Sequence, residues 1–189
     1  MSGSRYSSDV TPPRQRRGLN ARGGGFTLIE LMIVLVILGV ILAVAVPGFS
    51  QLGLSTKLKS YANQMVSSVY LARGESIKRN APMTLCVSTD GLACEGSGAW
   101  EDGWIVLDPN DLVLQYQQEV ANGFKMACTG TCPGSSSHTL TFEPSGLVGT
   151  QTTIRICRQT PSVGNQEREV EISATGKPRV NRTTDGTCP

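Results

Sequence analysis

The chain has 189 residues, of which 39% are hydrophobic and 17% are charged, as expected for one modest domain that also carries an apolar segment. Its formal net charge of +2 is unevenly distributed, because residues 1–25 hold five arginines and one aspartate, whereas the remaining residues hold 12 basic and 14 acidic side chains. A domain with that acidic balance is not a general binder of nucleic acids, so any such binding has to come from a local patch.

The N-terminal part combines a polar leader with an apolar run. Residues 1–25 are rich in Ser, Gly, Pro and Arg, a composition that cannot bury a core and predicts disorder. Residues 31–46 are apolar throughout, and no charge occurs between Glu30 and Lys57, which predicts a membrane helix with its N-terminus in the cytoplasm. An ordinary secretory signal cut after Ala43-Val44-Ala45 is the alternative. Glu30 argues against it, because a carboxylate is costly at the edge of an apolar run.

The apolar run is followed by an amphipathic pattern. Apolar residues recur at spacings of three and four, with polar residues between them, which predicts that the helix continues with one apolar face. The apolar positions are Leu54, Leu58, Tyr61, Met65, Val69 and Ala72. Asn80-Ala81-Pro82 predicts the end of the helix, because the residue before a proline disfavours helical geometry.

From Met83 onward, short runs rich in Val, Ile, Thr and aromatic residues alternate with turn signals such as Asp90-Gly91 and Asn122-Gly123. The predicted strands cover residues 83–88, 104–107, 112–118, 139–142, 153–158 and 168–173. Their regular spacing favours an antiparallel sheet.

All six cysteines follow the apolar run, and an even number on one side of a membrane anchor predicts disulfides in an oxidising compartment. Of 15 possible pairings, the expected one joins Cys86 to Cys94 across a hairpin, Cys128 to Cys132 across a small loop, and Cys157 to Cys188, which holds the tail. Zinc is the alternative for Cys128 and Cys132, but no second close pair completes a site. We therefore expect no metal and no cofactor.

The junction before the apolar run reads Gly23-Gly24-Gly25-Phe26-Thr27-Leu28-Ile29-Glu30-Leu31. It resembles the class III signal of type IV prepilins. The resemblance implies that a prepilin peptidase in the inner membrane cuts between Gly25 and Phe26 and methylates the new amine of Phe26. The apolar helix would anchor the subunit and later pack in the core of a filament. Glu30 would then meet the N-terminal amine of a neighbouring subunit, because an unpaired charge there is costly.

Three later segments resemble the GspH/FimT/FimU family of minor pilins and pseudopilins. They are Tyr70-Leu-Ala-Arg-Gly-Glu-Ser-Ile-Lys-Arg79, Phe142-Glu-Pro-Ser-Gly146 and Ile172-Ser-Ala-Thr-Gly-Lys-Pro-Arg-Val180. The resemblance implies an α+β fold, in which a long N-terminal helix packs on an antiparallel β-rich head, and a low-copy subunit near the filament tip. Residues 1–25 would be the leader, 26–49 the transmembrane and filament-core helix, 50–80 its amphipathic continuation, and 81–189 the periplasmic head.

The third segment contains a possible nucleic-acid contact. In some FimT-like minor pilins, a Gly-Arg-x-Arg motif contributes to DNA binding in natural transformation. The corresponding residues here are Gly176-Lys177-Pro178-Arg179, with Arg182 close by, so Lys177, Arg179 and Arg182 are candidates for contact with DNA. A solvated turn is the alternative, because three basic groups alone give only weak, salt-sensitive binding.

Two functional hypotheses of different classes result. One is a structural subunit that assembles with major and minor pilins to prime or cap a type IV pilus, with a type II secretion pseudopilin as a variant that shares the signal. The other is a module that holds DNA at the pilus tip. No enzyme is expected, because His138 has no partner arrangement in the sequence and no phosphate loop or metal motif occurs. Trp100 and Trp104 are expected to pack in a core rather than to form a sugar platform.

Overall fold

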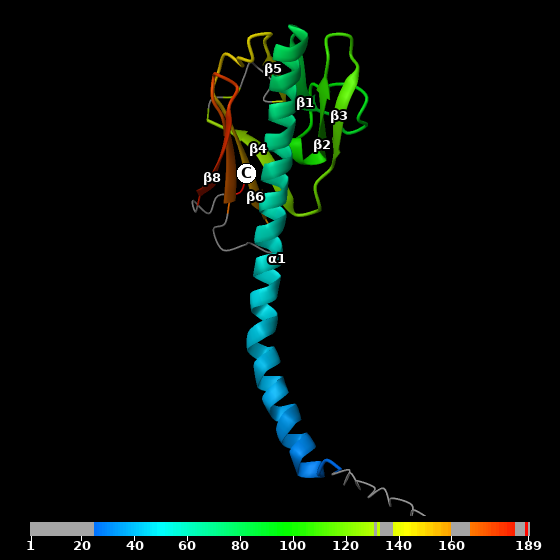
Figure 1. Cartoon of the computed structure of the whole chain (residues 1–189), viewed down its shortest axis with the longest axis vertical. Helices are drawn as coiled ribbons and strands as arrows, with labels where there is room; N and C mark the ends of the chain where they lie inside the picture. The colour runs from blue at the N-terminus through cyan, green and yellow to red at the C-terminus, as the bar shows by residue number, and fades with distance from the viewer. Residues whose placement is uncertain (1–24, 131, 133–137, 160–166, 184–187, 189) are drawn as a thin grey trace, which may run out of the picture. The chain divides into compact units, whose positions relative to one another are not determined.

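The structure is a computed structural model that describes residues 25–130, 132, 138–159, 167–183 and 188. The chain divides into two compact units, residues 1–43 and 44–189. Helix α1, Leu28–Arg79, contributes to both units, and all the strands belong to the second one (Figure 1). The long helix and the antiparallel strands confirm the α+β class.

In the second unit, α1 presents one apolar face to the core. Leu58, Ala62, Met65, Val69 and Ala72 are completely buried, at the spacing of three and four that the sequence predicts. Half-buried Leu54 extends this face toward the N-terminus of the helix, and half-buried Tyr61 flanks it beside Leu58. Burial of each large aliphatic side chain stabilises the fold by about 1.5–3 kcal/mol, so this face supplies much of the attachment between helix and sheets.

The helix ends where the sequence predicts. Asn80 adopts a positive φ of 50° and donates its backbone N–H to the carbonyl of Ile77, while Ala81 donates to the carbonyl of Ser76. These two bonds satisfy carbonyl groups of the last turn, which would otherwise lack partners. Pro82 follows and prevents further helix.

The strands form two antiparallel four-stranded sheets. The first sheet has the order β3-β2-β1-β5, with β1 at Met83–Val87, β2 at Gly103–Leu107, β3 at Val113–Gln118 and β5 at Thr139–Phe142. The second has the order β4-β6-β7-β8, with β4 at Phe124–Thr129, β6 at Thr152–Arg158, β7 at Glu167–Ile172 and β8 at Pro178–Thr183. In the view of Figure 1, β1, β2 and β3 lie on one side of the C-terminal half of α1, and β4, β6 and β8 lie on the other.

A single core joins the helix to both sheets. It contains α1 residues such as Met65, β1 residues such as Leu85, and β6 residues such as Ile154. Trp104 on β2 is 1% exposed and donates its ring N–H to the Ser68 hydroxyl on α1 at 2.9 Å. Trp100 begins a short 3-10 helix, η1, at Trp100–Asp102, and is 2% exposed. Both tryptophans therefore pack in the core, as predicted.

All six predicted strands are present, and their bounds differ from the predicted ones by one residue at most. Two further strands, β4 and β8, were not predicted. In β4, only Phe124 and Met126 are large apolar residues that face the core, and Lys125 and Ala127 between them give little β propensity. β8 is polar and begins with a proline, which fits its position at the edge of the sheet.

Candidate functional site

The predicted cleavage site lies immediately before α1. Gly25, Phe26 and Thr27 are not helical, and the Phe26 side chain is 83% exposed. Thr27 accepts the backbone N–H of Glu30 on its side-chain oxygen at 3.3 Å, so it caps the helix in the Thr-x-x-Glu pattern. The exposed Glu30 carboxylate lies in the first turn, where the helix dipole favours a negative charge. The Gly25–Phe26 bond is therefore non-helical and accessible, next to a capped helix start.

The first part of α1 is apolar all the way round. From Leu28 to Leu42, the large apolar side chains are between 46% and 76% exposed, whichever direction they point. Such a helix leaves its hydrophobic surface unburied within its own chain and requires an apolar environment.

Among the described residues, no helix combines the length and the apolar character that are needed to cross a membrane.

The three segments that resemble the minor pilin family come together at one place in the head. Arg73, from the helix segment, donates its Nε–H to the carbonyl of Thr175 at 3.2 Å. Its side chain also lies against both Gly146 and Gly176, which belong to the other two segments. The sequence places these segments far apart, and the structure shows that one arginine connects them.

Two turns of the same construction meet at this junction. In the first turn, the backbone N–H of Gly146 donates to the carbonyl of Glu143, and the N–H of Glu143 donates to the carbonyl of Leu147. In the second turn, the N–H of Gly176 donates to the carbonyl of Ser173, and the N–H of Ser173 donates to the carbonyl of Lys177. Each glycine has a positive φ, +77° for Gly146 and +71° for Gly176. A Cβ atom on Gly176 would lie 2.2 Å from the carbonyl oxygen of Gly146, so the close approach requires glycine. The glycine that precedes Lys177 thus has a structural role.

The structure brings together two of the three candidate DNA contacts: Lys177 and Arg179 line one hollow with Glu171, and Arg182 is not among its lining residues. Lys177 is exposed in the turn, while Arg179 and Arg182 lie on β8, three positions apart. Successive side chains on a strand point to opposite faces, so Arg179 and Arg182 face opposite sides of the sheet. Arg179 pairs in register with Glu171, and Glu167 and Glu169 lie on that same face of β7. The face that carries Arg179 is therefore rich in carboxylates rather than basic.

The cysteines form the three expected disulfides, Cys86–Cys94, Cys128–Cys132 and Cys157–Cys188. No free cysteine occurs in the chain, so the thiolates that the zinc alternative requires are absent. In the part of the chain that the structure describes, no three His, Cys, Asp or Glu residues are grouped so that they could hold a metal ion.

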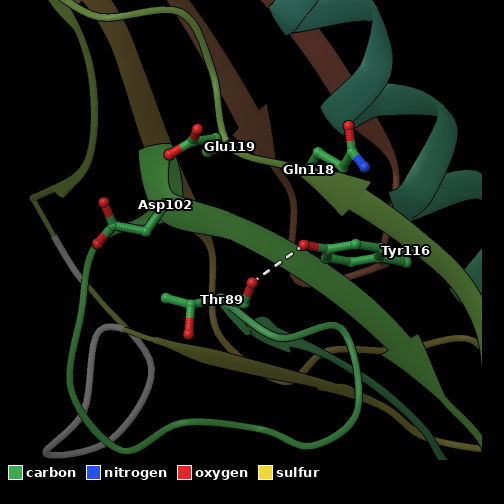
Figure 2. A pocket seen from close by; sticks show the side chains of 5 residues that line it. All are labelled: Thr89, Asp102, Tyr116, Gln118 and Glu119. Carbon is green, nitrogen blue, oxygen red and sulfur yellow. Dashed lines mark hydrogen bonds between the residues drawn. The ribbon is translucent and has the colours of Figure 1, made fainter.

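A polar hollow of about 410 Å³ opens on the head beside β3, lined by Thr89, Asp102, Tyr116, Gln118 and Glu119. Figure 2 shows the Tyr116 hydroxyl pointing to the backbone of Thr89, to which it donates a hydrogen bond at 3.0 Å. The ring of Tyr116 lies on Gly91, where a Cβ atom would approach it within 2.9 Å. The loop after β1, held by Cys86–Cys94, thus forms one wall. No sequence pattern indicates this hollow, because its residues come from separate segments.

The electrostatic contacts near the hollow are structural. Glu101, next to Asp102, accepts the ammonium of Lys125 at 2.9 Å and the backbone N–H of Met126 at 2.9 Å. The hydrogen bond and the negative charge of Glu101 raise the pKa of Lys125. These contacts attach η1 to β4. None of them places a nucleophile beside a general base, which is the arrangement that covalent catalysis needs.

Comparison with known proteins supports the resemblance to minor pilins and pseudopilins. The profile of the family described as type II transport protein GspH matches residues 61–176, and a prokaryotic N-terminal methylation motif matches residues 20–46. The pilin-like protein PilA1 of Thermus thermophilus is 45% identical over 67 residues, which cover 35% of this chain and 42% of that protein. The alignment thus spans less than half of the relative's length.

Two solved structures are similar to this chain. The type IV minor pilin FimU of Pseudomonas aeruginosa superposes with a TM-score of 0.51 and 19% identity, over 71% of this chain and 93% of that one. The minor pseudopilin EpsH of the Vibrio cholerae type 2 secretion system gives a TM-score of 0.46 and 16% identity, over 67% and 97% of the two chains. The FimU similarity supports the fold. Because the GspH profile covers more than half of the sequence, the chain belongs to the family of the type II transport protein GspH, the minor pilins and pseudopilins that its own motifs resemble.

Proposed function

We propose that this protein is a structural subunit of a type IV pilus-like filament, made as a prepilin and processed to begin at Phe26. The observation that carries the proposal is the combination of an exposed Gly25–Phe26 bond with a capped helix whose apolar side chains are exposed on all sides. A helix of this kind is soluble in lipid and equally in a bundle of similar helices. It serves first as an inner-membrane anchor and then as part of the filament core.

Head composition supports a location outside the cytoplasm. Three disulfides persist in oxidising compartments such as the periplasm and are rare in reducing ones. The prepilin peptidase is the processing partner, and other pilins are the assembly partners. The role near the tip follows from the family, because the GspH/FimT/FimU proteins that this chain resembles are minor subunits. The role is non-enzymatic: a scaffold that presents the head and docks through the helix.

Processing is tested by the intact mass of the membrane-bound protein. We expect a chain that begins at methylated Phe26 and retains the apolar run. A chain that begins at Val46 would contradict the proposal and indicate an ordinary secretory signal. Gly25→Val should block the cut in the cell. Among the described residues, a Cβ at Gly25 meets no atom within 4 Å, so a block of cleavage by that variant reports on the peptidase rather than on misfolding.

A further inference from the structure

Two arginines face each other across the last two strands of the second sheet. Arg168 on β7 and Arg182 on β8 are register partners, so their side chains leave the same face of the sheet. Arg168 is only 5% exposed, whereas Arg182 is exposed. Arg168 is thus almost buried as a residue, and Arg182 lies beside it at the surface.

The Arg168 guanidinium has few protein partners. Its one hydrogen bond to a described residue runs from Nη1 to the carbonyl oxygen of Glu167 at 2.9 Å, although a guanidinium has five N–H donors. No ion pair joins Arg168 or Arg182 to a carboxylate within the described ranges. Burial first, and the charge of Arg182 second, lower the pKa of Arg168. Arginine nevertheless keeps its proton in proteins, so both positive charges remain.

The nearby carboxylates are engaged elsewhere. Glu167, Glu169 and Glu171 alternate with Arg168 along β7 and leave the opposite face. Glu167 accepts the hydroxyl of Thr183, and Glu169 binds Arg155 with a closest distance of 2.7 Å. Glu171 accepts the amides of Gln151 and Asn181. None of them can neutralise the arginine pair without leaving its own partners.

A buried charge without a partner is costly, and a like charge beside it adds to the cost. An oxyanion between the two guanidinium groups would remove both penalties, because planar N–H forks bind carboxylate and phosphate oxygens in pairs. We propose that Arg168 and Arg182 form a binding site for a small oxyanion, either a carboxylate or a single phosphate group. The site does not depend on the filament role proposed above.

The burial of Arg168 selects the size of the ligand. A group that reaches the guanidinium of a residue with 5% exposure has to be slender, as a side-chain carboxylate or an inorganic phosphate is. The phosphates of a DNA duplex lie on a wide cylinder and could reach Arg182 alone. The acidic balance of the residues after the leader further disfavours a polyanion.

The test uses the full mature chain in a non-ionic detergent, with inorganic phosphate titrated against chloride at constant ionic strength. Phosphate should raise the melting temperature of the wild type and of Arg179→Gln, which removes a charge from the same strand but from its other face. It should not raise that of Arg182→Gln. In chloride alone, Arg182→Gln should melt no lower than the wild type, because it relieves a repulsion. An equal phosphate effect on Arg182→Gln, or none on the wild type, would overturn the site.

Asp185, which lies outside the described residues, provides a further control because it follows Arg182 closely in the sequence. An equal phosphate effect on Asp185→Asn and the wild type supports an external ligand. If only Asp185→Asn responds to phosphate, the chain's own tail fills the site and the proposal is wrong. Duplex DNA that competes with phosphate at equal phosphate concentration would also overturn the choice of a small anion.

Incorporation into filaments distinguishes a carboxylate of a neighbouring subunit from a free anion as the source of the oxyanion. If a neighbouring subunit supplies a carboxylate, Arg182→Gln should be depleted from sheared filaments relative to the membrane fraction, while Arg179→Gln is not. If both variants are incorporated normally and the wild type keeps its phosphate response, the ligand is a free anion. Both results support the site and differ only in what occupies it.

Discussion

At the scale of single residues, the junction around Arg73 gives a sharp prediction for Gly176. A Cβ there would lie 2.2 Å from the Gly146 oxygen, and the substituted residue would also have to adopt a φ of +71°. Backbone strain of this kind costs about 1–3 kcal/mol, and the overlap adds to it. We expect Gly176→Ala to lower the free energy of unfolding by about 3 kcal/mol or more, measured by urea denaturation.

Gly149 is the matched control for that prediction. It has a similar φ of +84°, but a Cβ there meets no atom of the described part of the chain within 4 Å. Gly149→Ala therefore isolates the effect of the positive φ and should lower the free energy of unfolding by about 1 kcal/mol. Equal losses for the two variants would show that the contact between the turns does not constrain the fold.

Asp108 gives a second prediction at this scale. It accepts the backbone N–H groups of Leu112 and Asn110 at 3.0 and 2.8 Å, and it lies 3.6 Å from the Arg79 guanidinium. The Leu112 hydrogen bond chiefly lowers the pKa of Asp108, against an opposing effect of burial. A carboxyl group with a lowered pKa contributes its full stability above its ordinary value, near 4, and loses that contribution as the pH falls through the native value.

The melting temperature of the wild type should therefore fall more steeply below about pH 4 than that of Asp108→Asn. Glu75 and Asp90, whose pKa values are also lowered, account for the slope that remains in the variant. Thermal unfolding followed by circular dichroism across this pH range measures both slopes. Parallel curves would show that Asp108 does not contribute to acid sensitivity.

At the scale of elements, strong periodicity made most of the fold predictable. The apolar spacing of three and four located the buried face of α1, and Asn80-Ala81-Pro82 located its end. β8 could not be predicted, because an edge strand needs only one partner and tolerates polar residues and a first proline. β4 is defined by its pairing with β6 rather than by its own propensity.

The disulfide between Cys157 and Cys188 explains how the polar strand β8 stays attached to the sheet. The bond joins the core of β6 to the tail after β8 and spans 31 residues, whereas Cys128–Cys132 spans four. By chain entropy, a loop of this length contributes about 3–4 kcal/mol and a very short one about 2 kcal/mol. Replacing Cys157 and Cys188 together with alanine should therefore destabilise the protein more than replacing Cys128 and Cys132.

Hydrogen exchange gives the measurement for β8 itself. In the Cys157→Ala, Cys188→Ala variant, the amides of β8 should exchange faster than those of β6, while the Cys128→Ala, Cys132→Ala variant should leave β8 protected. Unchanged protection of β8 in the first variant would show that strand pairing alone holds it.

At the scale of the whole molecule, local motifs and assembled surfaces differ in how far sequence can predict them. The glycine before Phe26 lies within one short motif, so the sequence alone identified it, whereas the helix cap at Thr27 in the same motif became evident only in the structure. The arginine pair of Arg168 and Arg182 depends on the register of β7 against β8, which no local pattern encodes. The alternation of side chains along β8, rather than this register, places Arg179 and Arg182 on opposite faces of the sheet and separates these two candidate DNA contacts.

Glu30 tests how the subunit joins its filament. The helix cap uses the backbone N–H of Glu30, so Glu30→Ala keeps the start of α1 while it removes the carboxylate. Membrane insertion should be unchanged, because the variant removes a charge from an apolar helix. Incorporation should fall by about tenfold or more, because the amine of a neighbouring Phe26 loses its partner in an apolar environment and breaking such a pair costs several kcal/mol. The ratio of subunit in sheared filaments to subunit in the membrane fraction measures this directly. Glu30→Gln, which keeps the shape and loses the charge, should fail to the same extent, and normal incorporation of either variant would show that the carboxylate does not select the docking partner.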